Sequence, residues 1–166
     1  MLSGRPGAVP AAVRVRRAVA RDAKRLTRIV RASRAYEGPY APLIAGYRVG
    51  PDYIEAHRVF VAVGAGSPEE SGEPVLGFYA LLLDPPELDL MFVSDAAQGR
   101  GIGRLLVAHL RDEARDAGIG EVRVVAHPPA EGFYLGVGAE RTGTVLARPP
   151  AVMWDRPDMV IRIAGE

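Results

Sequence analysis

The chain has 166 residues, of which 48% are hydrophobic and 25% are charged, a balance typical of one soluble globular domain. It contains no cysteine and only three histidines, which excludes disulfides, thiolate zinc sites and a cysteine nucleophile and leads us to expect no metal centre. No apolar run is long enough to span a bilayer.

The net charge of +1 conceals a strong asymmetry along the chain. Residues 1–34 carry ten Arg or Lys against the single Asp22, whereas the remaining residues carry eleven against nineteen Asp or Glu. A basic arm of this kind can bind nucleic acid or an anionic cofactor, or direct targeting. Because the basic positions recur at helical spacing, we expect instead the solvated face of one helix. We expect residues 1–12 to form a loose tail, residues 13–166 to form one domain, and the protein to be cytoplasmic.

The predicted elements begin with strand and helix patterns in the N-terminal half. Alternation of period two at 13–17 predicts an edge strand. Asp22 lies where the N-cap or a first-turn residue of a helix is expected, and the apolar spacing after it predicts a helix that Gly38-Pro39 ends. A weaker helix is expected near residue 51. Three strands follow, at 59–63, 75–83 and 88–93.

The C-terminal half continues with a glycine-rich turn and a strong amphipathic helix. The turn covers residues 98–103, and Gly118 is the expected stop of the helix. A buried strand, a short helix and two closing strands follow, at 121–126, 129–138, 142–146 and 159–163. Because strands and helices alternate in this order, we predict an α/β (α+β) fold with mixed strand pairing.

The sharpest feature of the chain is the turn Gln98-Gly-Arg-Gly-Ile-Gly103. Three glycines in five positions between a strand and a helix start would expose a row of backbone N–H groups at a helix N-terminus, where the dipole favours a pyrophosphate. Arg100 and Arg104 add fixed positive charge. The alternative is a tight strand-to-helix turn in which glycine serves the geometry alone.

Other phosphate-binding loops fit this turn less well. A P-loop ends in Gly-Lys-Ser/Thr, whereas Arg104-Leu105 follows the last glycine here. A dinucleotide fingerprint requires a third glycine where this chain has Arg104 or Leu106. That fingerprint also follows the first strand of a βαβ unit, whereas the turn here comes after at least four predicted strands.

Two motifs resemble those of the GNAT superfamily of acyl-CoA-dependent N-acetyltransferases. The acyl-CoA loop of that family, Gln/Arg-x-x-Gly-x-Gly/Ala, is matched at every specified position by residues 98–103. The segment 130–139, Ala-Glu-Gly-Phe-Tyr-Leu-Gly-Val-Gly-Ala, is similar to the second signature, Ala-x-x-Phe-Tyr-x-x-x-Gly-Phe/Ala. The order of the predicted elements also agrees from Val13 to Ile163, so the resemblance covers nearly the whole chain.

The resemblance implies a central mixed, mostly antiparallel sheet of about six to seven strands, flanked by about four helices and splayed between two central parallel strands. It also implies acetyl-CoA as the acyl donor, with its pantetheine arm along the strand before the loop and its pyrophosphate in the loop. A backbone N–H near Met91 or Phe92 would stabilise the oxyanion. The implied acyl-CoA-binding residues are Met91, Phe92, Val93, Gln98, Gly99, Arg100, Gly101, Ile102, Gly103 and Arg104.

Two further residues stand at positions that the family uses. Tyr134 falls where the family keeps a tyrosine that protonates the departing thiolate. A phenol of pKa ~10 is a weaker acid than a thiol of pKa ~8.5, so Tyr134 could instead only hydrogen-bond the sulfur, or pack the short helix. His127 stands where the family often has an asparagine that contacts the cofactor arm. A neutral imidazole can also donate a hydrogen bond, so His127 is predicted to contact the cofactor, with a strand-end histidine as the alternative.

The acceptor side of the reaction is less clearly marked in the sequence. An amine arrives as an ammonium and must lose a proton, so a carboxylate or an ordered water chain is required. Asp89, on the strand before the loop, is our candidate for this base, and Glu37 is the other. Tyr36, Glu37 and Tyr40 lie in a tyrosine-rich connection where the family builds its acceptor pocket, and we expect them to bind substrate. These tyrosines could also simply cover the sheet edge.

We therefore predict an N-acetyltransferase that transfers the acetyl group of acetyl-CoA to a primary amine by direct attack in a ternary complex. The expected acceptor is a small-molecule or protein amine; no nucleic acid and no membrane are expected as partners. One alternative is a non-catalytic acyl-CoA sensor of the same fold. Another is a nucleic-acid binder using the Arg-rich N-terminus, although aromatic residues for base stacking are missing between Arg14 and Arg34. A different donor, such as succinyl-CoA, and a homodimer remain open.

Overall fold

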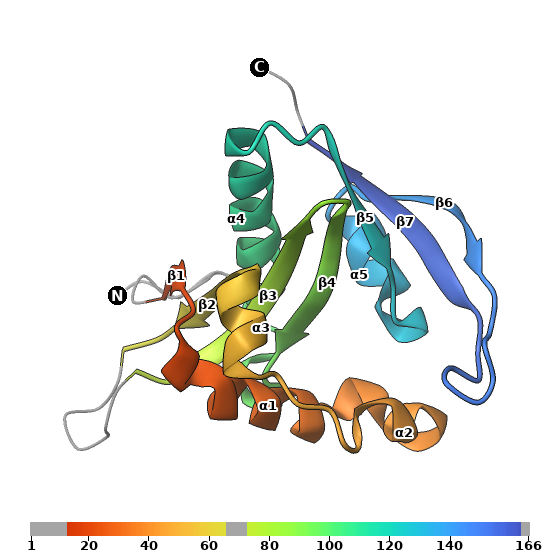
Figure 1. Cartoon of the computed structure of the whole chain (residues 1–166), viewed down its shortest axis with the longest axis horizontal. Helices are drawn as coiled ribbons and strands as arrows, with labels where there is room; N and C mark the ends of the chain where they lie inside the picture. The colour runs from red at the N-terminus through yellow and green to blue at the C-terminus, as the bar shows by residue number, and fades with distance from the viewer. Residues whose placement is uncertain (1–12, 66–72, 164–166) are drawn as a thin grey trace, which may run out of the picture.

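A seven-stranded sheet forms the centre of the computed structural model, which describes residues 13–65 and 73–163 (Figure 1). The strand order is β1-β2-β3-β4-β5-β7-β6, with β4 and β5 parallel and the other neighbours antiparallel. This confirms the predicted mixed, mostly antiparallel sheet. The tail expected at 1–12 lies outside the described residues. The strands are β1 (Arg14–Arg17), β2 (Arg58–Val63), β3 (Val75–Leu83), β4 (Pro86–Val93), β5 (Glu121–Val125), β6 (Glu140–Val145) and β7 (Arg156–Arg162).

Five α-helices occur in the described part of the chain, one more than predicted, because the connection after the first helix contains an additional single turn. The helices are α1 (Ala23–Ala32), α2 (Ala41–Ile44), α3 (Pro51–Ala56), α4 (Ile102–Asp116) and α5 (Glu131–Gly136). The 3₁₀ turns are η1 (Ala20–Asp22), η2 (Arg34–Tyr36), η3 (Gly38–Tyr40), η4 (Asp95–Ala97) and η5 (Pro128–Ala130). Within residues 13–65 and 73–163, no helix has the length and apolar character needed to cross a membrane.

The first helix ends earlier than predicted. α1 stops where the backbone of Ser33 becomes extended, not at Gly38-Pro39, and the chain continues through η2 and η3 into α2. The early end lets Tyr36 turn onto the sheet, where its ring stacks on Phe92 of β4 with ring centroids 5.6 Å apart. An aromatic contact between distant segments therefore takes precedence over the helical spacing of the sequence.

The sheet divides the core into two layers because successive side chains of a strand point to opposite faces. On one face, α4 and α5 pack in the same layer as Phe60 and Ala62 of β2. On the other face, α1, α2 and α3 pack with Val59, Val61 and Val63 of the same strand. The functional residues considered below lie where these two layers meet the middle of the sheet.

β5 is buried on one face only, which qualifies the buried strand predicted at 121–126. Val122 and Val124 are buried, whereas Glu121 and Arg123 are exposed. The layer formed by α1 to α3 takes its sheet residues from β2, β3 and β4. On β5 the Arg123 guanidinium instead makes two hydrogen bonds of 2.9 Å to the Asp158 carboxylate of β7.

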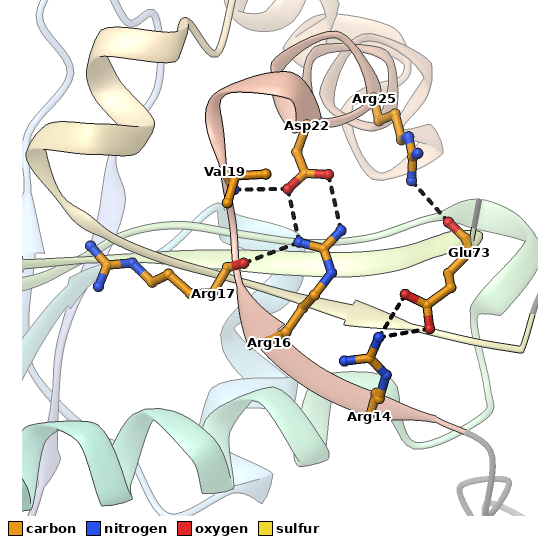
Figure 2. Close-up of polar contacts among 7 residues, drawn as sticks. All are labelled: Arg14, Arg16, Arg17, Val19, Asp22, Arg25 and Glu73. Atoms are coloured by element: carbon orange, nitrogen blue, oxygen red, sulfur yellow. Dashed lines mark hydrogen bonds and ion pairs between the residues drawn. The ribbon is translucent and has the colours of Figure 1, made fainter. Parts of the chain in front are cut away.

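A buried ion pair joins β1 to the start of the first helical segment (Figure 2). The Asp22 side chain is 0% exposed and accepts hydrogen bonds from Arg16 at 3.0 and 3.1 Å and from the Val19 N–H at 2.9 Å. Burial would raise the pKa of Asp22, but the hydrogen bonds from Arg16 and Val19 outweigh it and hold the pKa below its usual value. Asp22 thus lies in the first helical turn, one of the two predicted positions, and connects that turn to β1.

Replacing Asp22 tests this connection. We expect Asp22→Asn to lower the free energy of unfolding by about 3 kcal/mol, near the lower end for broken buried pairs because the Arg16 side chain is 22% exposed. Since folding lowers the pKa of Asp22, the stabilisation is complete above the unfolded pKa of about 4 and is lost as the pH falls through the folded pKa. Urea unfolding from about pH 7 to about pH 2 should show a shallower pH dependence in the variant.

The exposed pair between Asp112 and Arg115 provides the matched control. Their contact of 2.9 Å lies on the surface of α4, so Asp112→Asn is expected to change stability by less than about 0.5 kcal/mol. Equal losses in Asp22→Asn and Asp112→Asn would contradict a stabilising role for the buried pair.

Candidate active site

β4 and β5 separate soon after they meet. Within the described residues their parallel ladder joins a single pair, Glu87 and Arg123, and Figure 1 shows the two strands diverging toward the side on which α2 lies. A cavity of about 620 Å³ occupies this opening. Its walls come from β4, the end of β5, the glycine-rich turn, α5 and the segments around Tyr36 and Trp154. The predicted splay between two central parallel strands is thus present.

One edge of the cavity is the side of β4 that faces away from β3. In an antiparallel ladder, opposed residues alternate between hydrogen-bonded and non-hydrogen-bonded pairs. Ser94 donates its N–H to the Leu76 carbonyl at 2.8 Å. By this alternation the next residue to bond with β3 is Phe92, through its partner Phe78. The backbone groups of Phe92 are therefore used within the sheet.

Met91 and Val93 occupy the alternate positions, so their backbone N–H and carbonyl groups point toward β5, where the cavity opens. Gln98, the first residue of the predicted loop, donates a hydrogen bond from Nε2 to the Val93 carbonyl at 3.0 Å. This bond ties the loop to the strand. The backbone groups of Met91 and the N–H of Val93 remain directed at the cavity.

The turn before α4 brings a helix N-terminus to the cavity wall. Gly99 and Gly101 have φ angles of +77° and +78°, a conformation that glycine adopts without steric penalty. Gly101 is the N-cap of α4, so the first N–H groups and the dipole of this helix create positive potential beside the cavity. A Cβ at Gly103 would lie 2.9 Å from the Phe133 ring, so glycine there allows α4 to pack against α5.

The charged side chains that line the cavity are Asp89, Arg104 and Arg156. Arg100, which the sequence places in the same loop as Arg104, is exposed and lies outside the cavity wall. Glu37, the second candidate for the base, is also exposed and outside the wall. The structure therefore brings together one carboxylate and two guanidinium groups.

Asp89 lies on β4 beside Tyr53 of α3. It accepts a hydrogen bond of 2.5 Å from the hydroxyl of Tyr53 on α3. Burial raises the pKa of Tyr53, and the hydrogen bond to Asp89 raises it further, so the phenol stays protonated and remains the donor. The carboxylate is exposed and has room for a second partner from the cavity.

Tyr134, on α5, is buried and lines the cavity. Burial raises the pKa of its hydroxyl, with a further contribution from Tyr36. A higher pKa makes the phenol a weaker acid. The hydroxyl is therefore better suited to donate a hydrogen bond to an anionic sulfur than to surrender its proton to it.

An aromatic cluster links the connection after α1 to the end of β5. The rings of Tyr36 and His127 are stacked 3.7 Å apart with an angle of 8° between their planes. Tyr40 meets His127 and Trp154 edge-on at 4.6 and 4.8 Å. Tyr36, His127 and Trp154 line the cavity, and Tyr40 packs behind them. Burial raises the pKa of Tyr36 to about 12.

His127 is held by the backbone of η2. Its Nε2 lies 2.6 Å from the Ala35 carbonyl, an acceptor, so Nε2 carries the proton and Nδ1 is left as a bare acceptor. Burial lowers the pKa of His127, and the bond to Ala35 opposes this shift. The neutral imidazole thus uses its N–H within the protein, and the donation predicted toward a cofactor arm would require this bond to break.

Sequence reasoning missed Trp154 and Arg156, which also line the cavity. Trp154 lies in the segment between β6 and β7, and Arg156 is the first residue of β7. Both are far along the chain from the loop motif, and no motif marks them. One signal was available. Trp154 is the single tryptophan of the chain, and an indole placed at a pocket usually has a use for its N–H.

Residues 67–148 match the family model of the acetyltransferase (GNAT) domain. None of the curated protein sequences matches the chain.

Solved structures with low sequence identity share the fold. A GCN5-related N-acetyltransferase from Rhodopseudomonas palustris has a TM-score of 0.75 at 17% identity, over 98% of each chain. The yncA protein of Salmonella typhimurium, solved with its cofactor acetyl-CoA, has a TM-score of 0.67 at 19% identity, over 93% of this chain and 95% of that one. Spermidine N-acetyltransferase from Vibrio cholerae, in complex with CoA and spermine, has a TM-score of 0.68 at 16% identity, over 93% and 97%.

The family match spans both the glycine-rich turn and the α5 segment, the two regions whose motifs pointed to this family. The sheet, with its diverging parallel pair, has the fold of the solved neighbours. Residues 67–148 therefore belong to the acetyltransferase (GNAT) domain family, and the chain as a whole has the fold of the solved GNAT structures.

Proposed function

We propose that the chain is an N-acetyltransferase that transfers the acetyl group of acetyl-CoA to a primary amine by direct attack. The observation that carries the proposal is a single cavity that joins the free backbone edge of Met91 and Val93, the N-terminus of α4 and the buried Tyr134. Two structures of the same fold support it: one holds acetyl-CoA and the other holds CoA together with an amine, spermine.

The cavity has the groups that acetyl-CoA requires. The N–H groups at the start of α4 and the Arg104 side chain would bind the pyrophosphate. The backbone of Met91 and Val93 would pair with the pantetheine amides as an added strand does. The Met91 N–H is also the available donor for the oxyanion, because the Phe92 N–H bonds to β3. Acetyl-CoA supplies a thioester already activated toward an amine, so the protein chiefly has to hold both substrates together.

Two side chains would assist the reaction, one at the amine and one at the departing sulfur. Asp89 would accept a proton from the ammonium, either directly or through one water. Tyr134 would donate a hydrogen bond to the thiolate as it departs.

Because the amine attacks the thioester itself, intact protein incubated with acetyl-CoA alone should carry no acetyl group in a mass spectrum. With amines added, the acceptor should gain one acetyl group. Acetyl-CoA binding without any acetylated amine would favour the sensor alternative.

Tyr134→Phe is expected to lower kcat about tenfold to a hundredfold, the value of a hydrogen bond to a charged group. The affinity for acetyl-CoA should change little, since the hydroxyl acts on the leaving sulfur. Initial rates with saturating acetyl-CoA, together with calorimetric titration of the cofactor, separate the two quantities.

Tyr79→Phe is the matched control for loss of a buried hydroxyl. The Tyr79 hydroxyl bonds to His109 Nδ1 at 2.8 Å in the core beneath α4, away from the cavity. This variant should lose stability but retain kcat. An unaltered kcat in Tyr134→Phe would reduce that residue to a packing role.

A further inference from the structure

Three buried polar atoms in the described part of the chain have no hydrogen-bond partner: His127 Nδ1, Trp154 Nε1 and Arg156 Nε. All three residues line the cavity between β4 and β5. Native proteins leave few buried polar groups unpaired, and such groups call for a specific explanation. Their concentration in one cavity indicates that a ligand completes them.

The three side chains form one contiguous wall. Tyr40 contacts both the His127 ring and the Trp154 ring. Arg156 follows Trp154 by two residues and begins β7. Its charge also acts on Tyr36, where it opposes the effect of burial on the pKa, and Tyr36 is stacked on His127. A ligand that reaches one of these groups can therefore reach the others.

The two donors of the wall, on Trp154 and Arg156, favour a negatively charged group, whereas the acceptor His127 Nδ1 requires a donor elsewhere on the ligand. Indole Nε1–H and guanidinium Nε–H are donors only, so both require an acceptor. Within the described residues Arg156 forms no ion pair. By contrast, Arg123 of β5 pairs with Asp158, and Arg162 of β7 pairs with Glu121 and Glu140. A partly buried guanidinium without a counter-ion is costly. A carboxylate would satisfy both donors at once.

The opposite charge is available in the same cavity. Among the described residues, Asp89 is the one acidic side chain that lines it, and its carboxylate is suited to an ammonium group. We propose that the acceptor is a small molecule carrying both an amine and a carboxylate, an amino acid, whose carboxylate binds Arg156 and Trp154. This proposal rests on the proposed acetyltransferase function and names its substrate class. It excludes a plain polyamine, which has nothing to offer Arg156.

Binding can be tested separately from turnover. Free L-amino acids are titrated into the CoA-saturated protein by calorimetry, each beside its decarboxylated amine and beside short peptides that begin with the same residue. The wild-type protein should bind at least one amino acid, and should bind its decarboxylated amine about tenfold to a hundredfold more weakly. The peptides show whether the carboxylate must belong to a free amino acid.

Two variants identify the groups responsible. Arg156→Gln and Trp154→Phe should weaken amino-acid binding and raise its KM about tenfold or more, with no change for the decarboxylated amine or for acetyl-CoA. Arg28→Gln removes an exposed guanidinium on the outer face of α1 and should change none of these values. Equal losses for amino acid and amine, loss of acetyl-CoA affinity in Arg156→Gln, preference for the peptide, or no amino-acid binding would overturn the proposal.

These experiments distinguish failure of the carboxylate site from failure of the proposed acetyltransferase function. Amino-acid binding that depends on Arg156 but gives no acetylated product would leave the carboxylate site intact and refute the transferase. Acetylation of amines without any dependence on a carboxylate would support the transferase and refute the carboxylate site.

Discussion

Gly101→Val is expected to abolish measurable acetyl-CoA binding while the protein still folds cooperatively. Gly101 has a φ of +78° and is the N-cap of α4, so any other residue there is strained by about 1 to 2 kcal/mol. A branched side chain in this conformation would displace the turn and turn the first N–H groups of α4 away from the pyrophosphate position. Calorimetric titration with acetyl-CoA measures the loss, and urea unfolding measures the stability.

Gly118→Val is the matched control at the other end of the same helix. Gly118 has a φ of +76°, and a Cβ there meets nothing within 4 Å. The two substitutions should therefore cost similar stability, but Gly118→Val should keep the wild-type affinity for acetyl-CoA because it lies outside the cavity wall. Undiminished binding in Gly101→Val would mean that the turn does not hold the cofactor.

Asp89→Asn is expected to reduce kcat by about 10²- to 10⁴-fold, the range for a lost general base. Asparagine keeps an oxygen that can accept the Tyr53 hydrogen bond, so the local packing should survive. The affinity for acetyl-CoA should not change, because Asp89 acts on the amine. Initial rates measured for both proteins with the same amine, together with calorimetric titration of acetyl-CoA, provide the test.

Glu87→Gln controls for the removal of a negative charge from the same strand. Glu87 precedes Asp89 by two residues on β4 but lies outside the cavity wall. Its substitution should leave kcat unchanged. If Asp89→Asn keeps the wild-type kcat, the base is another group or a water.

The elements that are local in sequence were predicted well. β3 was predicted with its observed ends because its apolar run is bounded by Pro74 and Asp84-Pro85 on either side. The turn at 98–103 was placed at the start of α4 because glycine spacing and an amphipathic pattern agree there. The two family motifs then supplied the strand pairing, which periodicity alone could not give.

The acceptor side was predicted less well because its residues are assembled from distant segments. Tyr36 reaches the cavity because α1 ends early, whereas its neighbour Glu37 does not line the cavity. Trp154 and Arg156 also line the cavity, and the ring of Trp154 is held there by its contact with Tyr40. No periodicity or motif encodes such contacts, since they depend on how the β6–β7 segment folds back on the connection after α1.

Release of free CoA from acetyl-CoA across a panel of amines tests the central claim most directly. The protein has no cysteine, so a thiol-reactive dye reports CoA alone. An N-acetyltransferase gives amine-dependent release, and the most active amines identify the acceptor class. Absence of release with every amine, in a protein that binds acetyl-CoA, would contradict amine acetylation and leave an acyl-CoA-binding protein.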